Sequence, residues 1–80
     1  MRLDKYLKVS RLIKRRTVAN EACDGGRVSV NGAQAKASRE VKPGDIIEIG
    51  FGSRTIRVEV VSTAEGRSKN DAELMYKELH

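Results

Sequence analysis

The stretch KRRTVANEACDGGRVSVNG, residues 14–32, predicts a basic helix that passes directly into a strand. A double glycine ends the predicted helix, because glycine adopts the left-handed turn of a helix end at little cost. The following RVSVN alternates as a half-buried strand does, with Val28 and Val30 on one face, and Asn-Gly marks a tight turn. The helix has one apolar side, built by residues at helical spacing. They are Val18, Ala19, Ala22 and Cys23.

The segments on either side of this stretch indicate a small α+β domain. Apolar residues at helical spacing predict a first helix from about Leu3 to Val9. Residues 33–42 are small and polar and predict a loop, and Pro43-Gly44-Asp45 predicts a turn into the strand IIEIGF. GFGS then joins that strand to RTIRVEVV, which also alternates. We therefore expect two short N-terminal helices packed on a small antiparallel sheet of three or four strands.

The C-terminal part of the sequence has a different character. Residues 1–62 form the predicted domain, and the segment that follows lacks apolar periodicity, which predicts a flexible link. Asn70 and Glu73 have the spacing of a capping box for a C-terminal helix. Such a helix of roughly ten residues is marginal by itself. The expectation for residues 63–80 is thus a flexible link and a short helix.

The composition limits the possible classes of function. Eighty residues make one domain whose core is too small to enclose a deep pocket. Only Tyr6, Phe51 and Tyr76 are aromatic, so base stacking is not expected as the main mode of RNA binding. No apolar run approaches the roughly 20 residues that span a bilayer, and the N-terminus is too charged for a signal peptide. We expect a soluble, cytoplasmic protein with no membrane partner.

Residues able to support catalysis are scarce. Cys23 is the only cysteine, which excludes an internal disulfide or a multi-cysteine zinc site and fits a reducing compartment. It lies on the buried side of the second helix, and the only histidine is the terminal His80, so a Cys-His nucleophile is not expected. Asp4 is interpreted as a partner of the helix dipole or of a cation. We expect no enzyme, cofactor or metal.

The charge of the chain is concentrated at one end. Residues 1–27 contain eight cations and three anions, a net charge of +5, whereas the remaining residues contain eight of each. Solubility alone explains such an asymmetry poorly. A polyanionic partner is therefore predicted, and nucleic acid is the favoured one.

The second helix predicts where this partner binds. Arg16 and Asn20 lie about 40° apart around the helix, beside its apolar side, so both can face outward. Lys14, Arg15 and Arg16 occupy its first turn, where the helix dipole disfavours cations unless a phosphate docks there. Arg15 points toward the apolar side unless the helix starts later, at Thr17. The alternative is that the basic cluster merely ends a connector.

The residues also resemble a known family. RLDKYLKVSRLIKRRTVANEACDGGRVSVNG, followed by AKASREVKPGDIIEI, is similar over residues 2–50 to the RNA-binding domain named after ribosomal small-subunit protein S-four. The resemblance implies the alpha-L fold, with an RNA-contacting face on the two helices and an adjacent loop. Phosphate contacts that read RNA by shape are the implied mode. The implied RNA-binding residues are Arg2, Lys5, Arg11, Lys14, Arg15, Arg16, Asn20 and, in the loop, Lys36.

Stand-alone members of this family suggest a specific role. We expect no attached enzyme domain, so the resemblance is to the small ribosome-associated heat-shock proteins and, more closely, to bacterial ribosome-associated quality-control factors. It implies binding to a stalled large ribosomal subunit that carries peptidyl-tRNA. Contacts to large-subunit ribosomal RNA and to the tRNA would hold the tRNA in the P site while an alanine-tailing factor acts. Arg2 and Arg16 are the principal expected contacts.

Two other classes of function stay open. In a helix-turn-helix protein, the second helix would enter a DNA major groove, with Arg16 and Asn20 as base readers. A protein-interaction module would instead use exposed strand edges or the terminal helix. No dimerisation element is evident, so we expect a monomer.

Overall fold

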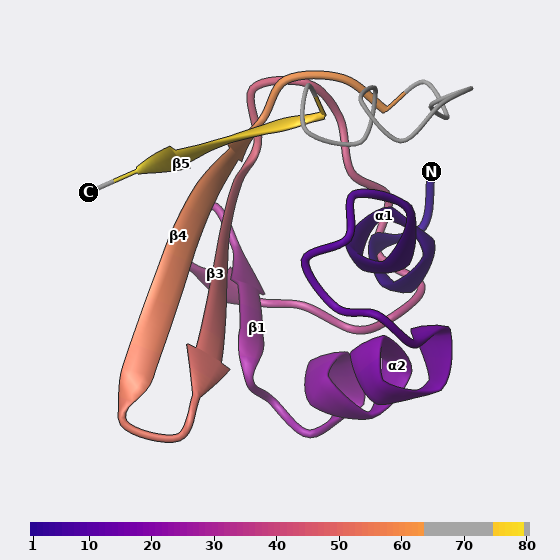
Figure 1. Ribbon diagram of the computed structural model, residues 1–80, viewed down its shortest axis with the longest axis vertical. Helices are drawn as coiled ribbons and strands as arrows, with labels where there is room; N and C mark the ends of the chain where they lie inside the picture. The colour runs from indigo at the N-terminus through magenta and orange to yellow at the C-terminus, as the bar shows by residue number, and fades with distance from the viewer. Residues whose placement is uncertain (64–74, 80) are drawn as a thin grey trace.

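The computed structural model describes residues 1–63 and 75–79 and contains two α-helices and one antiparallel sheet (Figure 1). Both helices lie on the same side of the sheet, so the molecule has two layers. This confirms the predicted α+β fold. No helix in the described ranges is long and apolar enough to cross a bilayer. The elements are α1 (Leu3–Val9), α2 (Arg16–Asp24), β1 (Val28–Val30), β2 (Ala33–Gln34), β3 (Ile46–Phe51), β4 (Arg54–Val60) and β5 (Tyr76–Leu79).

The central strands of the sheet, β1, β3 and β4, alternate between more and less buried side chains. The strand order is β2-β1-β3-β4-β5, with every neighbouring pair antiparallel. Val30 pairs with Ile47, and Ile47 pairs with Val58, so apolar side chains on three strands share one face. All three are buried. Burial of this face against the helices is the main source of the fold's stability.

Helix α1 has the predicted bounds and supplies the largest buried side chains of the helical layer. Leu3, Tyr6 and Leu7 are fully buried. The Tyr6 hydroxyl donates a hydrogen bond of 2.6 Å to the carbonyl of Met75, the residue that precedes β5. The same carbonyl accepts two backbone N–H groups, from residues 61 and 62. Tyr6 therefore ties the first helix to the last strand of the sheet.

Helix α2 is shorter than predicted, and less of its apolar side is buried. It begins at Arg16, so Lys14 and Arg15 precede it and are not in its first turn. Ala19 and Cys23 are buried, but Val18 is 47% exposed, which corrects the expected four-residue stripe. Ala19 and Cys23, four positions apart, point at the core. Val18 lies about 100° around the helix from Ala19 and therefore points away from the core. The double glycine ends the helix as predicted, with Gly26 in the left-handed region at φ +83°.

The predicted polar loop is in part a buried support for α1. Residues 33–34 form strand β2 after a tight turn, and Ala35, Ala37 and Val41 are buried. The backbone N–H groups of Leu3 and Asp4 donate to loop carbonyls, at 2.7 and 3.2 Å. These bonds satisfy N–H groups that have no partner within the helix. Alanines that looked like loop residues are therefore packing residues.

The expected C-terminal helix is wrong for the residues that the structure describes there. Tyr76–Leu79 form strand β5, which pairs with β4 from Val60↔Tyr76 to Arg57↔Leu79. The proposed capping box, Asn70 with Glu73, and most of the predicted link lie outside the described residues. Pairing with the open edge of β4 satisfies the backbone groups of both strands, which a marginal isolated helix would not do.

The hydrogen bond from Tyr6 yields a test of how α1 and β5 are joined. We expect Tyr6→Phe to lower the free energy of unfolding by about 1 kcal/mol, because the ring volume stays while one buried hydrogen bond is lost. Tyr76→Phe is the matched control, since within the described residues the Tyr76 hydroxyl has no hydrogen-bond partner. Urea unfolding monitored by circular dichroism measures both. Equal stability of wild type and Tyr6→Phe would contradict the prediction.

Candidate nucleic-acid interface

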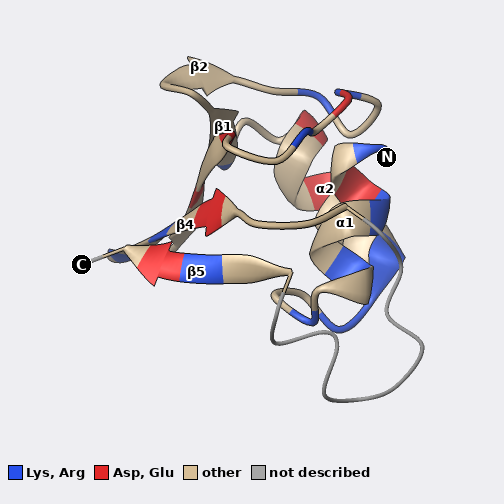
Figure 2. Ribbon diagram, turned by 90° about the horizontal axis from the view of Figure 1, so that it is seen from above, with Lys and Arg blue, Asp and Glu red and all other residues tan. Residues whose placement is uncertain are grey.

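Seven of the eight cations in residues 1–27 lie on the helices, directly before α1 or on the connector between the helices. Figure 2 shows lysine and arginine gathered on α1, on the connector and at the start of α2, whereas the sheet carries both signs of charge. We call this surface the basic face. Its members are Arg2, Lys5, Lys8, Arg11, Lys14, Arg15 and Arg16. The excess of positive charge on this layer suits a polyanionic partner.

Four residues of the helical layer meet at the carboxylate of Asp4. Arg2 bonds Asp4 through Nε, which donates to Oδ1 at 3.2 Å, and through Nη2, which donates to Oδ2 at 3.4 Å. The Nε of Arg16 and the Nδ2 of Asn20 both donate to Oδ2, at 3.3 Å. The backbone N–H of Lys5 donates to Oδ1 at 2.8 Å. We call Arg2, Asp4, Arg16 and Asn20 the Asp4 cluster.

The Asp4 cluster keeps its charges in two different environments. The Asp4 side chain is only 3% exposed, whereas those of Arg2 and Arg16 are 51% and 47% exposed. Burial raises the pKa of Asp4, but hydrogen bonds from Asn20, Arg16 and the Lys5 backbone, with the charge of Arg16, leave it below its usual value. Asp4 is therefore ionised at neutral pH and holds two guanidinium groups at the protein surface.

The remaining predicted cations surround this cluster without joining it. Arg11, Lys14 and Arg15 are exposed, and their side chains make no hydrogen bond or ion pair to another described residue. Arg15 is the N-cap residue of α2 and precedes the helix, so it does not point at the apolar side. Lys5 is half-buried on α1. The structure thus places these three exposed cations, with the exposed Lys8, on the chain between Arg2 and Arg16.

Lys36 occupies a different place from the other predicted residues. It is exposed in the loop after β2, beside a hollow of about 180 Å³ that also involves Asp24, Gly25 and Gly26 at the C-terminal end of α2. Arg16 and the Asp4 cluster lie at the other end of that helix. The fold therefore does not bring Lys36 together with the rest of the predicted set.

Sequence reasoning missed the central role of Asp4 in this geometry. Its interpretation as a partner of a cation is confirmed by ion pairs with Arg2 and Arg16. A shallow hollow of about 370 Å³ next to it is lined also by Thr17 and Glu21 on the outward side of α2. The helical spacing of Arg16 and Asn20 was the available signal, but it could not show that both side chains turn toward α1.

Cys23 does not form a reactive centre. The residue is 1% exposed, and burial, together with the nearby Asp4 and Asp24 carboxylates, raises the pKa of its thiol to about 11. A protonated, enclosed thiol is neither a nucleophile nor a metal ligand at neutral pH. Among the described residues, no group of three potential metal-ligating side chains comes together.

Comparison with known proteins agrees with this geometry. Residues 1–47, which include both helices and the Asp4 cluster, match the family described as the S4 domain. The chain belongs to the S4 domain family. It is 55% identical to the RQC P-site tRNA stabilizing factor of Bacillus subtilis over 76 residues, which cover 95% of this chain and 88% of that protein.

A relative with a solved structure shares the whole fold. The structure of a trimeric heat shock protein 15 from Vibrio cholerae superposes with a TM-score of 0.88 at 31% identity and covers 99% of this chain and 81% of the other. A heat shock protein 15 homologue of Aeromonas salmonicida is 34% identical over 98% of this chain and 60% of its own length. The chain is thus similar to both kinds of named relative.

The lowered pKa of Asp4 predicts how stability depends on pH. A carboxylate whose pKa is lower in the folded state stabilises the fold above its unfolded value near 3.8, and this contribution is lost as the pH falls through the folded value. We expect the free energy of unfolding of the wild type to fall between about pH 5 and pH 2, and that of Asp4→Asn to fall less. Urea unfolding across this range measures both. An equal fall in the two proteins would refute the assignment.

Proposed function

We propose that this chain is a non-catalytic RNA-binding factor of ribosome-associated quality control. In this proposal it binds stalled large ribosomal subunits that carry peptidyl-tRNA and holds the tRNA in the P site while an alanine-tailing factor extends the nascent chain. The observation that carries the proposal is the 55% identity, over 95% of this chain, to a protein named RQC P-site tRNA stabilizing factor. The basic face supplies the surface that such a role needs.

The chemistry of the basic face supports phosphate binding. Arg2 and Arg16 present half-exposed guanidinium groups, whose planar shape matches a phosphate with two parallel hydrogen bonds. The start of α2 has no side-chain cap, so its first N–H groups can donate to a phosphate oxygen. Contacts of these two kinds read the shape of a folded RNA and not its base sequence.

The remaining cations extend the proposed contact. Lys14, Arg15 and Arg11 are exposed between the two helices, and Lys5 lies on α1. A tRNA and a hairpin of large-subunit ribosomal RNA would be held by one surface at the same time. Two linked contacts lengthen the residence of the complex beyond what either gives alone. Lys36 would meet RNA only if the partner also reached the far end of α2.

A second candidate is a large-subunit recycling factor of the heat-shock type. The observation that favours it is the TM-score of 0.88 with heat shock protein 15. Both candidates use the basic face, so RNA affinity does not separate them. Cells that lack this chain separate the two candidates. Under the quality-control proposal, these cells lose the C-terminal alanine tails on a stalled reporter protein, as measured by mass spectrometry. Unchanged tails would favour recycling.

The decisive experiment is co-sedimentation of the tagged protein with cell lysate on a sucrose gradient, followed by identification of the RNA in its peak. The wild type is expected with large subunits that contain tRNA, and Arg16→Ala is expected to leave that peak. A wild-type peak with small subunits, with intact ribosomes or only in the top fractions would refute the proposal.

Single-residue variants test the proposed contacts. We expect Arg2→Ala and Arg16→Ala each to weaken binding to large subunits by about 1–3 kcal/mol, the range for hydrogen bonds to charged groups. Arg54→Ala is the matched control, because it removes one exposed arginine at the start of β4, away from the helical layer. Filter binding measures affinity, and circular dichroism verifies folding. An equal loss in all three variants would argue for net charge alone.

Salt and competitors separate the proposal from its rivals. We expect the logarithm of the binding constant for large subunits to fall steeply and linearly with the logarithm of the salt concentration, because phosphate contacts release counterions. Binding that survives high salt would favour a protein-interaction module. Duplex DNA that displaces the RNA as well as tRNA does would favour a helix-turn-helix mode.

A further inference from the structure

A buried carboxylate at the centre of a surface for RNA needs an explanation. Asp4 is ionised and lies within the basic face, where its charge repels phosphate. A charge that is removed from water is also unfavourable unless partners compensate for it. The partners of Asp4 are the side chains of Arg2, Arg16 and Asn20 and the backbone of Lys5. All four of these residues are in the predicted RNA-binding set.

The hydrogen bonds leave the outer ends of both arginines available. In the described contacts, Arg16 donates to Asp4 only through its Nε–H group. Both of its terminal amino groups therefore remain available to another acceptor. Arg2 uses Nε and one terminal nitrogen, Nη2. Both side chains are about half exposed. One carboxylate therefore fixes the inner edge of two guanidinium groups, one from the residue that precedes α1 and one from the first residue of α2.

Fixing these groups before binding has an energetic consequence. A free arginine side chain occupies many rotamers, and a ligand that immobilises it must overcome that lost freedom. Preorganised groups avoid most of this loss, which raises affinity without any new contact to the ligand. The shared carboxylate also sets the spacing of the two guanidinium groups, so they act as a unit.

We propose that Asp4 is a positioning residue that holds Arg2 and Arg16 as one preformed phosphate-binding pair. The inference rests on the proposed function, because it concerns how that RNA surface is built. Asp4 itself touches no phosphate. Asn20 supports the same oxygen as Arg16 and restricts the rotation of the carboxylate. The pair is thus assembled by the contact between α1 and α2 and not by either helix alone.

The test is Asp4→Asn, because simple electrostatics and positioning predict opposite results. Removal of a negative charge from a surface that binds RNA should strengthen binding. Positioning predicts instead that affinity for large subunits falls by about 5- to 30-fold. Glu21→Gln is the matched control: it removes a carboxylate beside the same hollow, and the Glu21 side chain has no hydrogen bond or ion pair within the described residues. Its affinity should stay equal or rise.

A spectroscopic readout tests positioning without RNA. In the wild type, the Nε–H protons of Arg2 and Arg16 should give separate, slowly exchanging NMR signals, since both are hydrogen-bonded to Asp4. In Asp4→Asn these signals should exchange faster and move toward those of exposed arginines. Persistence of both protected signals in this variant would overturn the proposal.

The failure of positioning and the failure of the RNA site can be distinguished. If Asp4→Asn binds as tightly as wild type while Arg16→Ala is weakened, positioning is refuted and the RNA site stands. If neither Arg2→Ala nor Arg16→Ala loses affinity, the RNA site itself is refuted, and the positioning proposal falls with it.

Arg16→Lys keeps the test available if Asp4→Asn does not fold. Lysine retains the positive charge but has a single ammonium group. It cannot donate to Asp4 with one nitrogen and present other nitrogens outward, as arginine does. We expect it to lose nearly as much affinity as Arg16→Ala, whereas Arg54→Lys, on the sheet, should bind like wild type. Wild-type affinity of Arg16→Lys would overturn the proposal.

Discussion

The carboxylate of Asp4 is the contact on which the arrangement of the helical layer depends. A buried charge is tolerated only when its hydrogen-bonding capacity is filled by partners with the right geometry. Here the partners come from before α1, from α1 itself and from two positions one turn apart on α2. The two helices are therefore joined through a polar contact at the surface as well as through Ala19, Cys23 and the α1 core. The same contact decides which way Arg2 and Arg16 face.

The rest of the molecule supports this arrangement. The loop after β2 anchors the first N–H groups of α1, and its Ala37 N–H donates to Asp24 at the end of α2, at 3.1 Å. One loop thus holds the two helices at opposite ends. The sheet below carries apolar residues toward the helices, and Tyr6 links α1 to the start of β5. The loop, the sheet and the last strand therefore all contact the helices that carry the basic face.

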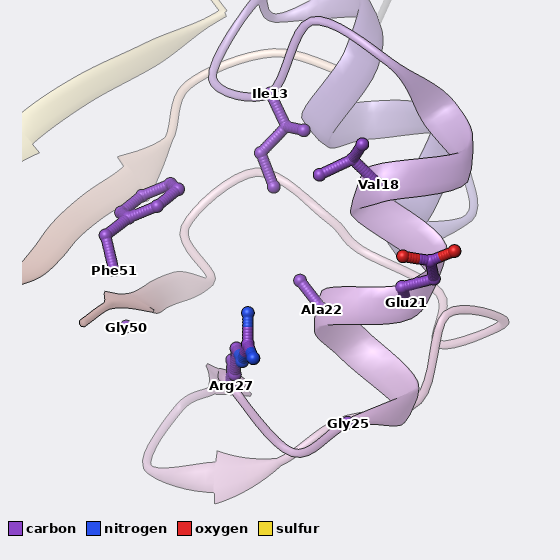
Figure 3. Close-up of a pocket in the computed structure, with 8 residues that line it drawn as sticks. All are labelled: Ile13, Val18, Glu21, Ala22, Gly25, Arg27, Gly50 and Phe51. Carbon is purple, nitrogen blue, oxygen red and sulfur yellow. The ribbon is translucent and has the colours of Figure 1, made fainter.

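This construction bears on the classes of partner that the surface suits. Arg16 and Asn20 are the candidate base readers of a helix-turn-helix mode, but both are engaged with Asp4. A side chain that is held by a carboxylate has less freedom to reach base edges in a groove, whereas an exposed guanidinium edge can still meet a phosphate. The geometry is consistent with the S4 domain family and with relatives named for tRNA and for ribosome quality control. A hollow of about 240 Å³ lies on another side of α2, where the apolar side chains of Ile13, Val18 and Phe51 share the lining with the charged Glu21 and Arg27 (Figure 3).

The sequence by itself determined helix α1, the end of α2 at the double glycine, the strands VSV, IIEIGF and RTIRVEV and the concentration of positive charge, because these depend on local periodicity and composition. It left Asp4 as a partner either of the helix dipole or of a cation. Only the tertiary structure decided which cations, since Arg16 is twelve positions away and reaches Asp4 through the packing of two helices. The same holds for the buried alanines of the loop, for exposed Val18 and for Tyr76–Leu79, where pairing with β4 forms a strand from residues with a helical pattern. Contacts between distant segments outweigh local preference in each of these places, because burial and backbone pairing contribute more free energy than a short helix gains alone.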